Sequence, residues 1–172
     1  DWRGMLMEDI FQKNGMDRVE FMLSANPGES LKPLEKVASG GEMSRIMLAF
    51  KAIAANADSI PTLIFDEIDT GISGHIAAVV GEKMVSIADN HQVLCVTHLP
   101  QIAALADVHF MVQKQDDGQT TRTSLKRLEM EERYEYIARM MSGMEDSKLA
   151  YEHARELITH SEEIKQKRRK NK

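Results

Sequence analysis

A short, mostly apolar segment that ends in two carboxylates limits most strongly what this chain can fold into. Thr62–Phe65 follows a proline and runs directly into Asp66 and Glu67. A strand that is apolar throughout, instead of alternating, is typical of burial on both faces of a sheet. Open α/β sheets bind their ligands at the carboxyl edge, where this strand becomes polar. The segment therefore predicts an α/β fold with a site beside Asp66 and Glu67.

The paired carboxylates suit the hydrolysis of a nucleoside triphosphate. Magnesium prefers oxygen ligands and keeps several waters, so Asp66 could hold the ion while substrate phosphates complete its shell. Phosphoryl transfer also needs a group that positions the attacking water, and Glu67 could supply it. The alternative is an acidic turn that only caps the next helix, and these two residues alone do not exclude it.

Composition restricts the class of protein. A chain of 172 residues is long enough for one domain with a hydrophobic core. Its single cysteine, Cys95, excludes a disulfide framework within the chain and favours a reducing cytoplasm. No apolar run reaches the length of a membrane span and no signal-peptide pattern is present, so neither a membrane segment nor export is indicated.

The net charge of −5 is unevenly distributed along the chain. Residues 165–172 carry six basic and no acidic side chains, so the rest of the chain is strongly acidic. An acidic body does not attract a phosphate backbone without help. The tail could bind nucleic acid or an acidic partner. Basic side chains in a last turn also suit the helix dipole, which favours a solvated, frayed helix end.

Hydrophobic periodicity and turn residues predict alternating strands and helices within one domain, residues 1–172. The expected order is a weak helix at 5–13, a strand at 18–24, a loop at 29–37, a helix from Gly40 to about Asn56, the strand at 62–65, a helix at 74–89, a strand at 92–97, a short helix at 101–105, a hairpin of edge strands at 108–114 and 120–128, and two closing helices separated by Ser142 and Gly143.

The segment Ser39-Gly40-Gly41-Glu42 precedes a helix that is apolar nearly all round. Its S-x-x-E spacing is that of a capping box, in which the serine and the glutamate satisfy free amides of the first turn. The paired glycines leave the N-terminal amides uncovered, and bare amides at the positive end of a helix form an anion site. Each glycine costs about 1 kcal/mol relative to alanine in a helix, which capping alone does not explain.

A P-loop, G-x-x-x-x-G-K-[ST], is missing from the sequence, because none of the ten glycines is followed by lysine. Asp66 and Glu67 therefore lack the loop that would cradle the β and γ phosphates. The chain alone should bind nucleotide poorly. Either the P-loop lies on another segment or the triphosphatase interpretation is wrong.

The order of these features resembles the C-terminal half of an ABC-type ATPase head, with a signature motif at Ser39–Glu42, Walker B and D-loop at 63–74, and an H-loop at His98. The residues within and around these motifs indicate a narrower family. The segments ASGGEMSR, LIFDEIDTGISG, VTHLPQIAALAD and ARMMSG together resemble the RecN family, the bacterial DNA-repair members of the SMC-like group. The resemblance runs from about Met16 to Ile158, which is most of the chain.

The resemblance implies a mostly parallel sheet flanked by helices, with an edge hairpin and two C-terminal helices. In that family an N-terminal half carries the P-loop, and a long antiparallel coiled coil joins it to this half. Residues 1–15, which begin with DWRGM, would then be the exit of the coiled coil or the remnant of a cut. The implied partners are the N-terminal half, a second head in a homodimer, and DNA, with no membrane and a location at the bacterial nucleoid.

The same resemblance implies ATP and Mg²⁺ as cofactors, with Asp66 serving the metal, Glu67 polarising the water and His98 reaching the γ-phosphate. Ser39, Gly40, Gly41 and Glu42 would contact a nucleotide held by the second head, so that binding and head closure are one event.

Ser73 stands where SMC-type heads usually carry aspartate. It could still cap the next helix and hydrogen-bond across the interface, but the change puts a charge-based contact there in doubt. The other five histidines are expected to be surface or structural residues.

Two other functions remain open. Residues 66–69 could be the DExD box of a helicase core, but that predicts an S-A-T-like motif where residues 95–98 read CVTH, and it leaves Ser39–Glu42 unexplained. The chain could instead be a dimerisation or DNA-tethering module without catalysis. Its acidic body argues against direct duplex binding, so residues 165–172 would be the only candidate contact.

Overall fold

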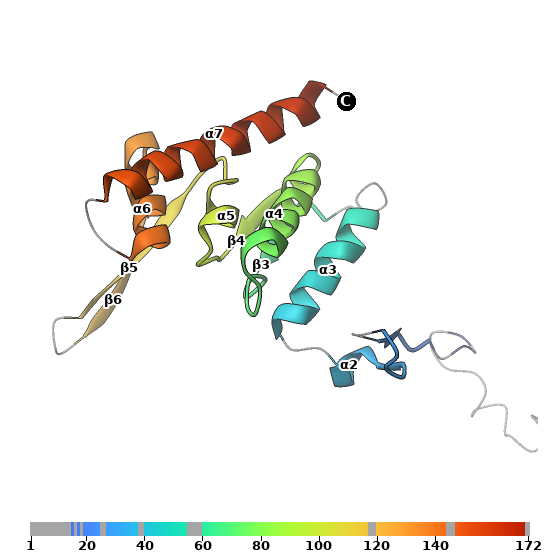
Figure 1. The fold of residues 1–172 in the computed structure, drawn as a ribbon. Helices are drawn as coiled ribbons and strands as arrows, with labels where there is room; N and C mark the ends of the chain where they lie inside the picture. Colours follow the sequence, from blue (N-terminus) through green and yellow to red (C-terminus); the bar gives the residue numbers. More distant parts are fainter. Residues whose placement is uncertain are drawn as a thin grey trace, which may run out of the picture. The chain divides into compact units, whose positions relative to one another are not determined.

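The structure is a computed structural model (Figure 1), which describes residues 15, 17, 19–24, 27–37, 40–54, 60–116, 120–143 and 147–170. The chain divides into two compact units, residues 1–39 and residues 40–172, and each is described by itself. The helix expected at 5–13 lies outside the described residues. Among the described helices, none is long and apolar enough to span a bilayer.

The first unit contains a small antiparallel pair. Strand β1 (Met22–Leu23) pairs with β2 (Lys32–Pro33), and a single turn of helix, α2 (Leu34–Val37), follows. The amide of Leu34 donates to the carbonyl oxygen of Phe21 at 2.8 Å. The prediction of a loop at 29–37 is wrong, because β1 supplies hydrogen-bond partners that the local sequence does not reveal. The strand expected at 18–24 is only two residues long.

The second unit is built on a parallel strand pair. Strand β3 (Thr62–Phe65) pairs with β4 (Gln92–Cys95) in the register Thr62 to Gln92 through Phe65 to Cys95. Helix α4 (Gly74–Ala88) makes the crossover between them, and α3 (Gly40–Ala54) lies beside α4 (Figure 1). A β-helix-β crossover joining parallel strands confirms the α/β class.

The described residues cover only one face of this strand pair. Leu63 and Phe65 are buried in a core that also contains Ile68 and side chains of α3, α4 and α5 (Pro100–Ala103). On the opposite face Ile64 is 72% exposed and Val96 60% exposed. The prediction that β3 is buried on both faces is therefore wrong for this chain, since its described helices all pack against the same side.

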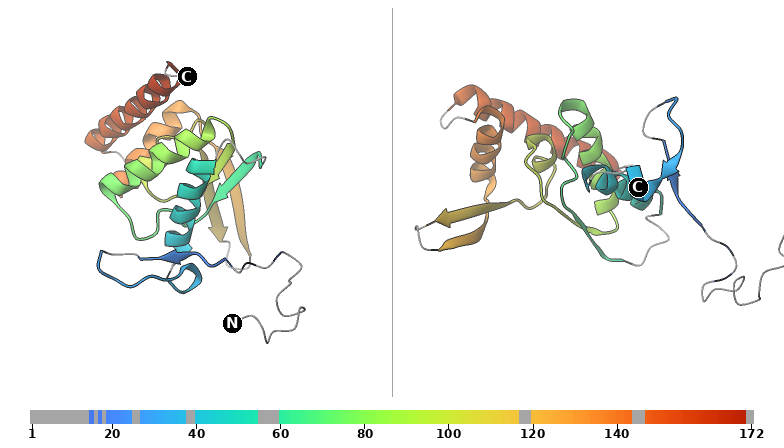
Figure 2. Two further views of the ribbon diagram at one scale, coloured as in Figure 1. Left: turned by 90° about the vertical axis from the view of Figure 1, so that its right-hand side faces the viewer. Right: turned by 90° about the horizontal axis from the view of Figure 1, so that it is seen from below.

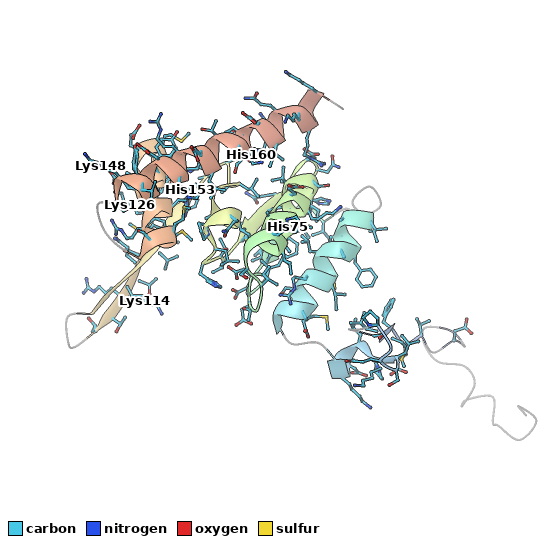
Figure 3. All side chains as sticks on the ribbon, viewed as in Figure 1. His75, Lys114, Lys126, Lys148, His153 and His160 are labelled. Carbon is cyan, nitrogen blue, oxygen red and sulfur yellow. The ribbon has the colours of Figure 1, made fainter. Side chains whose placement is uncertain are left out.

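The hairpin forms a sheet of its own. Strand β5 (Phe110–Asp116) pairs antiparallel with β6 (Thr121–Arg127), and every residue of β6 is exposed. Among the described strands the hairpin is hydrogen-bonded only within itself, so it is not an edge of the β3–β4 sheet. Its polar sequence agrees with this exposure, and Figure 3 shows Lys114 extending from it. The turn expected at Asp116–Gly118 lies partly outside the described residues.

Two helices form the C-terminal layer around a second core. Helix α6 (Met130–Ser142) begins with a capping box between Glu129 and Glu132, and Gly143 ends it with a φ of 65°, in the left-handed region that glycine adopts readily. Helix α7 (Lys148–Lys170) packs along α6, and Figure 2 shows its full length from two sides. The break predicted at Ser142 and Gly143 is confirmed.

The basic end of α7 is held against the rest of the second unit. Lys165 is only 5% exposed, and its ammonium group contacts Asp107 Oδ1 at 3.0 Å and Glu162 Oε1 at 2.7 Å. Arg168 Nη2 lies 3.1 Å from Oδ2 of Asp89, the residue that ends α4. The prediction of a solvated, frayed end is therefore wrong for Lys165 and Arg168, whereas Lys167, Arg169 and Lys170 are exposed as expected. Carboxylates distant in sequence fix this turn of the helix.

Candidate functional site

The turn that follows β3 presents two exposed carboxylates, Asp66 and Glu67. Glu67 has a φ of 56°, an uncommon value for any residue except glycine, and its amide donates to Asp66 Oδ1 at 3.0 Å. The amide of Thr70 donates back to the carbonyl oxygen of Glu67 at 3.1 Å. Strained backbone of this kind is concentrated at functional sites, where the surrounding structure holds it in place.

Helix α3 fixes this turn through two side chains. Ser44 Oγ donates to the carbonyl oxygen of Asp66 at 2.9 Å. Arg45 Nη1 donates to the carbonyl oxygens of Ile68 and Thr70, at 3.2 and 2.9 Å. Since both residues lie near the start of α3, the N-terminal end of the helix and the carboxylate turn form one hydrogen-bonded assembly, the α3 clamp.

The two glycines at the start of α3 make room for the same turn. A methyl group at Gly40 would lie 2.8 Å from Glu67 Oε2, and one at Gly41 would lie 2.9 Å from the carbonyl oxygen of Glu67 and 3.0 Å from Cβ of Thr70. Gly41 is buried there, whereas Gly40 is exposed. Close packing is thus a structural reason for two residues whose helix propensity is poor.

A buried aspartate joins the ends of β3 and β4. Asp69 is 3% exposed, and its Oδ2 accepts hydrogen bonds from Thr97 Oγ1 at 2.6 Å and from the amide of His98 at 2.8 Å. His98 Nδ1 lies 3.0 Å from the same oxygen. Burial acts to raise the pKa of Asp69, but the hydrogen bonds and the nearby His98 outweigh it and hold that pKa below its ordinary value. Asp69 is therefore ionised at neutral pH.

Several predicted site residues come together at this edge. Asp66 and Glu67 follow β3, and His98, whose side chain is 72% exposed, is tied to the same turn through Asp69. Gly40 and Gly41 lie against Glu67. The structure thus gathers acidic groups, one histidine and a glycine-rich helix start at the carboxyl ends of two parallel strands.

Other predicted residues are placed differently. Ser39 lies outside the described residues, so the capping box with Glu42 stays a prediction; Glu42 itself is exposed in the first turn of α3. Ser73 is the N-cap residue of α4 by backbone geometry, but its side chain makes no hydrogen bond to the described first turn. The expected side-chain cap is therefore not formed.

Four of the other five histidines lie at positions that agree with the expected surface or structural roles. His75 at the start of α4 and His153 and His160 along α7 are exposed (Figure 3). His91 is buried, and its Nδ1 lies 2.8 Å from the carbonyl oxygen of Ile60, where it supports the approach to β3.

Four residues of the site had no role predicted from the sequence: Ser44, Arg45, Asp69 and Thr97. Ser44 and Arg45 read locally as ordinary helix residues. Asp69 and Thr97 carried a signal, since each is a polar residue directly beside a proposed functional segment. Nothing in the sequence specifies that they meet across 28 residues.

Asp66 fits a magnesium ion in its donor type and its exposure. The described residues contain no group of three or more His, Cys, Asp or Glu side chains that could hold a metal by themselves. Magnesium is usually bound by one or two carboxylates together with substrate phosphates. The cluster Asp66, Glu67 and Asp69 would repel a bare triphosphate, so the residues fit a magnesium-bound one.

Comparison with family models gives no match. The chain is 51% identical to the DNA repair protein RecN of Halalkalibacterium halodurans over 155 residues, which are 90% of this chain and 27% of that protein. It is 46% identical to RecN of Bacillus subtilis over 154 residues, 89% and 27% of the two chains. For RecN of Treponema pallidum the identity is 47% over 144 residues, 84% and 25%. The chain thus spans about a quarter of the length of these relatives.

Among solved structures, a chain from "Structural biochemistry of ATP-driven dimerization and DNA stimulated activation of SMC ATPases" is 21% identical. It covers 70% of this chain and 80% of its own length, with a TM-score of 0.48.

Proposed function

This chain is a relative of the DNA repair protein RecN, and we propose that it is the C-terminal half of a RecN-type ATPase head that acts in the repair of DNA double-strand breaks. It supplies part of an ATP-hydrolysing site, and another segment of the protein holds the nucleotide through a P-loop. The proposal rests on one observation: Asp66, Glu67 and His98 are gathered at the carboxyl ends of the parallel strands β3 and β4.

Each of these side chains has a distinct chemical task in the proposal. Asp66 offers an oxygen ligand to the magnesium ion, which would neutralise charge on the phosphates when bound. Glu67 accepts a hydrogen bond from the attacking water and orients it, and His98 contacts the terminal phosphate. Asp66 and Glu67 are exposed and His98 is largely exposed, so a ligand can reach them.

The start of α3 and Ser73 are assigned to a second nucleotide. Exposed backbone at Gly40 and the N-terminal end of α3 suit the terminal phosphate of ATP held by another head. Ser39 and Glu42 flank it in the sequence, and Ser73 is exposed at the start of α4. Two such heads would complete two sites across a two-fold axis.

The face of the strand pair that the described residues leave exposed supports the proposal that a further segment packs there. Ile64, Leu94 and Val96 are 72%, 45% and 60% exposed on adjacent strands. An apolar face of this kind is normally covered in a parallel sheet. The segment that carries the P-loop is the natural partner for it, since the sequence supplies the acidic groups of such a site but not the loop.

The basic end of α7 is a weaker candidate for tethering DNA than its charge suggests. Lys165 and Arg168 are already paired with carboxylates. Lys167, Arg169 and Lys170 remain exposed, and they would carry any contact with phosphates.

The test is ATP turnover by the 172-residue chain, alone and mixed with the P-loop-bearing remainder of the protein. We expect background turnover alone and clear turnover after mixing. Glu67→Gln should then lower kcat about 100- to 10,000-fold, the usual range for loss of a positioned proton acceptor. Glu82→Gln, on the exposed side of α4, is the matched control and should leave kcat unchanged. Full turnover by the Glu67→Gln variant would refute the assignment.

A further inference from the structure

The hydrogen bonds around His98 converge on one oxygen atom. Asp69 Oδ2 accepts from Thr97 Oγ1 and from the amide of His98, and it also faces His98 Nδ1. Two contacts, the hydroxyl and the amide, would be enough to join the two strand ends. The contact with the imidazole ring is additional, and it concerns a side chain that is otherwise 72% exposed.

An exposed histidine ordinarily rotates and exchanges the proton between its two ring nitrogens. Here the neighbouring atom is an ionised carboxylate oxygen, which can only accept a hydrogen bond. Nδ1 must therefore carry a proton for the 3.0 Å contact to be favourable. If Nδ1 donates to Asp69 Oδ2, the ring is held in one orientation and Nε2 is the nitrogen left for a ligand.

Further hydrogen bonds support this arrangement. Thr97 Oγ1 donates to Asp69 and accepts from the amide of Leu99 at 3.0 Å, so the chain around His98 is fixed on both sides. Asp69 itself lies in the turn whose carbonyl oxygens, at Ile68 and Thr70, accept hydrogen bonds from Arg45. The carboxylate is thus a fixed reference point for the imidazole.

We propose that Asp69 is the positioning residue of His98: it keeps Nδ1 protonated and presents Nε2 to the terminal phosphate. This rests on the proposed function for the role of Nε2, but the state of the ring does not. Asp69 touches neither nucleotide nor metal in this account and acts only through His98.

The first experiment measures the protonated nitrogen of His98 directly. Long-range ¹H–¹⁵N correlation spectra of the 172-residue chain at pH 8.5 distinguish the two ring nitrogens, and His98→Gln assigns the signal among the six histidines. At that pH an ordinary histidine, with a pKa of about 6.5, is neutral. Protonation of Nδ1, alone or with Nε2, supports the proposal. Protonation of Nε2 alone overturns it, and neither outcome depends on ATP.

Two variants separate positioning from simple support. Asp69→Ala should move the proton of the neutral ring to Nε2, while Thr97→Val, which removes a different bond to the same oxygen, should leave it on Nδ1. If Thr97→Val shifts the signal as much as Asp69→Ala, Asp69 has only a structural role. The wild-type spectrum decides the matter if the Asp69→Ala chain fails to fold.

A second experiment uses the complete head. Asp69→Asn should lower kcat about 10- to 100-fold with a smaller effect on KM, by analogy with the carboxylates that orient metal-ligating histidines. In a His98→Gln background the same change should have little further effect, because both act on one group. Additive losses would overturn the proposal. Absence of any turnover in the wild-type head would refute the proposed function while the spectra still report on Asp69.

Discussion

Replacing the two glycines of α3 one at a time tests whether they are present to make room for the carboxylate turn. In Gly41→Ala the new methyl group would meet the Glu67 carbonyl oxygen at 2.9 Å, Thr70 Cβ at 3.0 Å and Arg45 Nη1 at 3.1 Å. The first two of these atoms belong to the turn itself. In Gly40→Ala it would meet only Glu67 Oε2, at 2.8 Å, and that atom ends a flexible side chain.

The expected magnitudes follow from two opposing terms. Alanine stabilises a helix by up to about 1 kcal/mol relative to glycine. Forcing an extra methyl group into packed structure costs about 1–3 kcal/mol when the neighbours cannot move. Gly40→Ala should therefore leave the free energy of unfolding unchanged or slightly raised, since Glu67 can rotate away. Gly41→Ala should lower it by up to about 2 kcal/mol, because the turn is fixed by Ser44 and Arg45.

Urea unfolding followed by circular dichroism measures both variants against the wild type. A fall in the midpoint at constant m-value for Gly41→Ala, with no fall for Gly40→Ala, is the expected result. Equal effects of the two substitutions would show that helix propensity governs both sites. A stabilised Gly41→Ala chain would refute the steric argument altogether.

Three further predictions concern single side chains. The lowered pKa of Asp69 adds stability that is present above the unfolded value of about 3.9 and is lost as pH falls through the folded value, so the free energy of unfolding should fall more steeply below pH ~4.5 in the wild type than in Asp69→Asn. Urea titrations from pH 7 to about pH 2.5 check this, because the stabilisation is lost mainly below the unfolded value, and equal slopes would contradict it. Burial and the charges of Asp69 and Asp66 raise the pKa of Cys95 to about 12. Iodoacetamide at pH 8 should therefore alkylate the Cys95 thiol far more slowly in the folded chain than in the chain unfolded by guanidinium. Equal alkylation rates would contradict this expectation. Ile137 of α6 is fully buried in the core against α7. Ile137→Ala should lower the free energy of unfolding by about 2–5 kcal/mol and Ile137→Val by about 0.5–1.5 kcal/mol. Denaturant midpoints that rank the two variants in the other order would rule out a packed core there.

The elements that position the site could be predicted because their signals are local. The apolar run at 62–65, the apolar stripe of the helix at 74–88 and the run at 92–95 each fix a strand or helix by periodicity. Asp66, Glu67 and His98 then fall at strand ends by counting residues. Their proximity follows from the general rule for parallel strands and did not need the structure.

The supporting contacts could not be predicted because they join residues far apart in the sequence. Asp69 meets His98 across 29 residues, and Lys165 meets Asp107 across 58. Each of these side chains alone reads as an exposed charge. Burial of Lys165 depends on how α7 packs, which the pattern of apolar residues in α7 does not specify.

The exposed face of β3 shows a different limit. The run Thr62–Phe65 indicates burial on both faces, but the described chain covers one. The sequence is consistent with a sheet larger than this chain provides. Local composition indicates how apolar a strand is, but it does not specify which of its faces the rest of the chain covers.

The α3 clamp bears on how the two nucleotide sites of the proposed dimer are related. In the proposed dimer, the start of α3 contacts one nucleotide and the turn at 66–70 contacts the other. Ser44 and Arg45 join these two parts of the chain by hydrogen bonds. A small displacement of the start of α3 at one ATP would then also move the carboxylates that act on the second ATP. Under that proposal, the parts that serve the two nucleotides are adjacent in the fold and connected directly by side-chain hydrogen bonds.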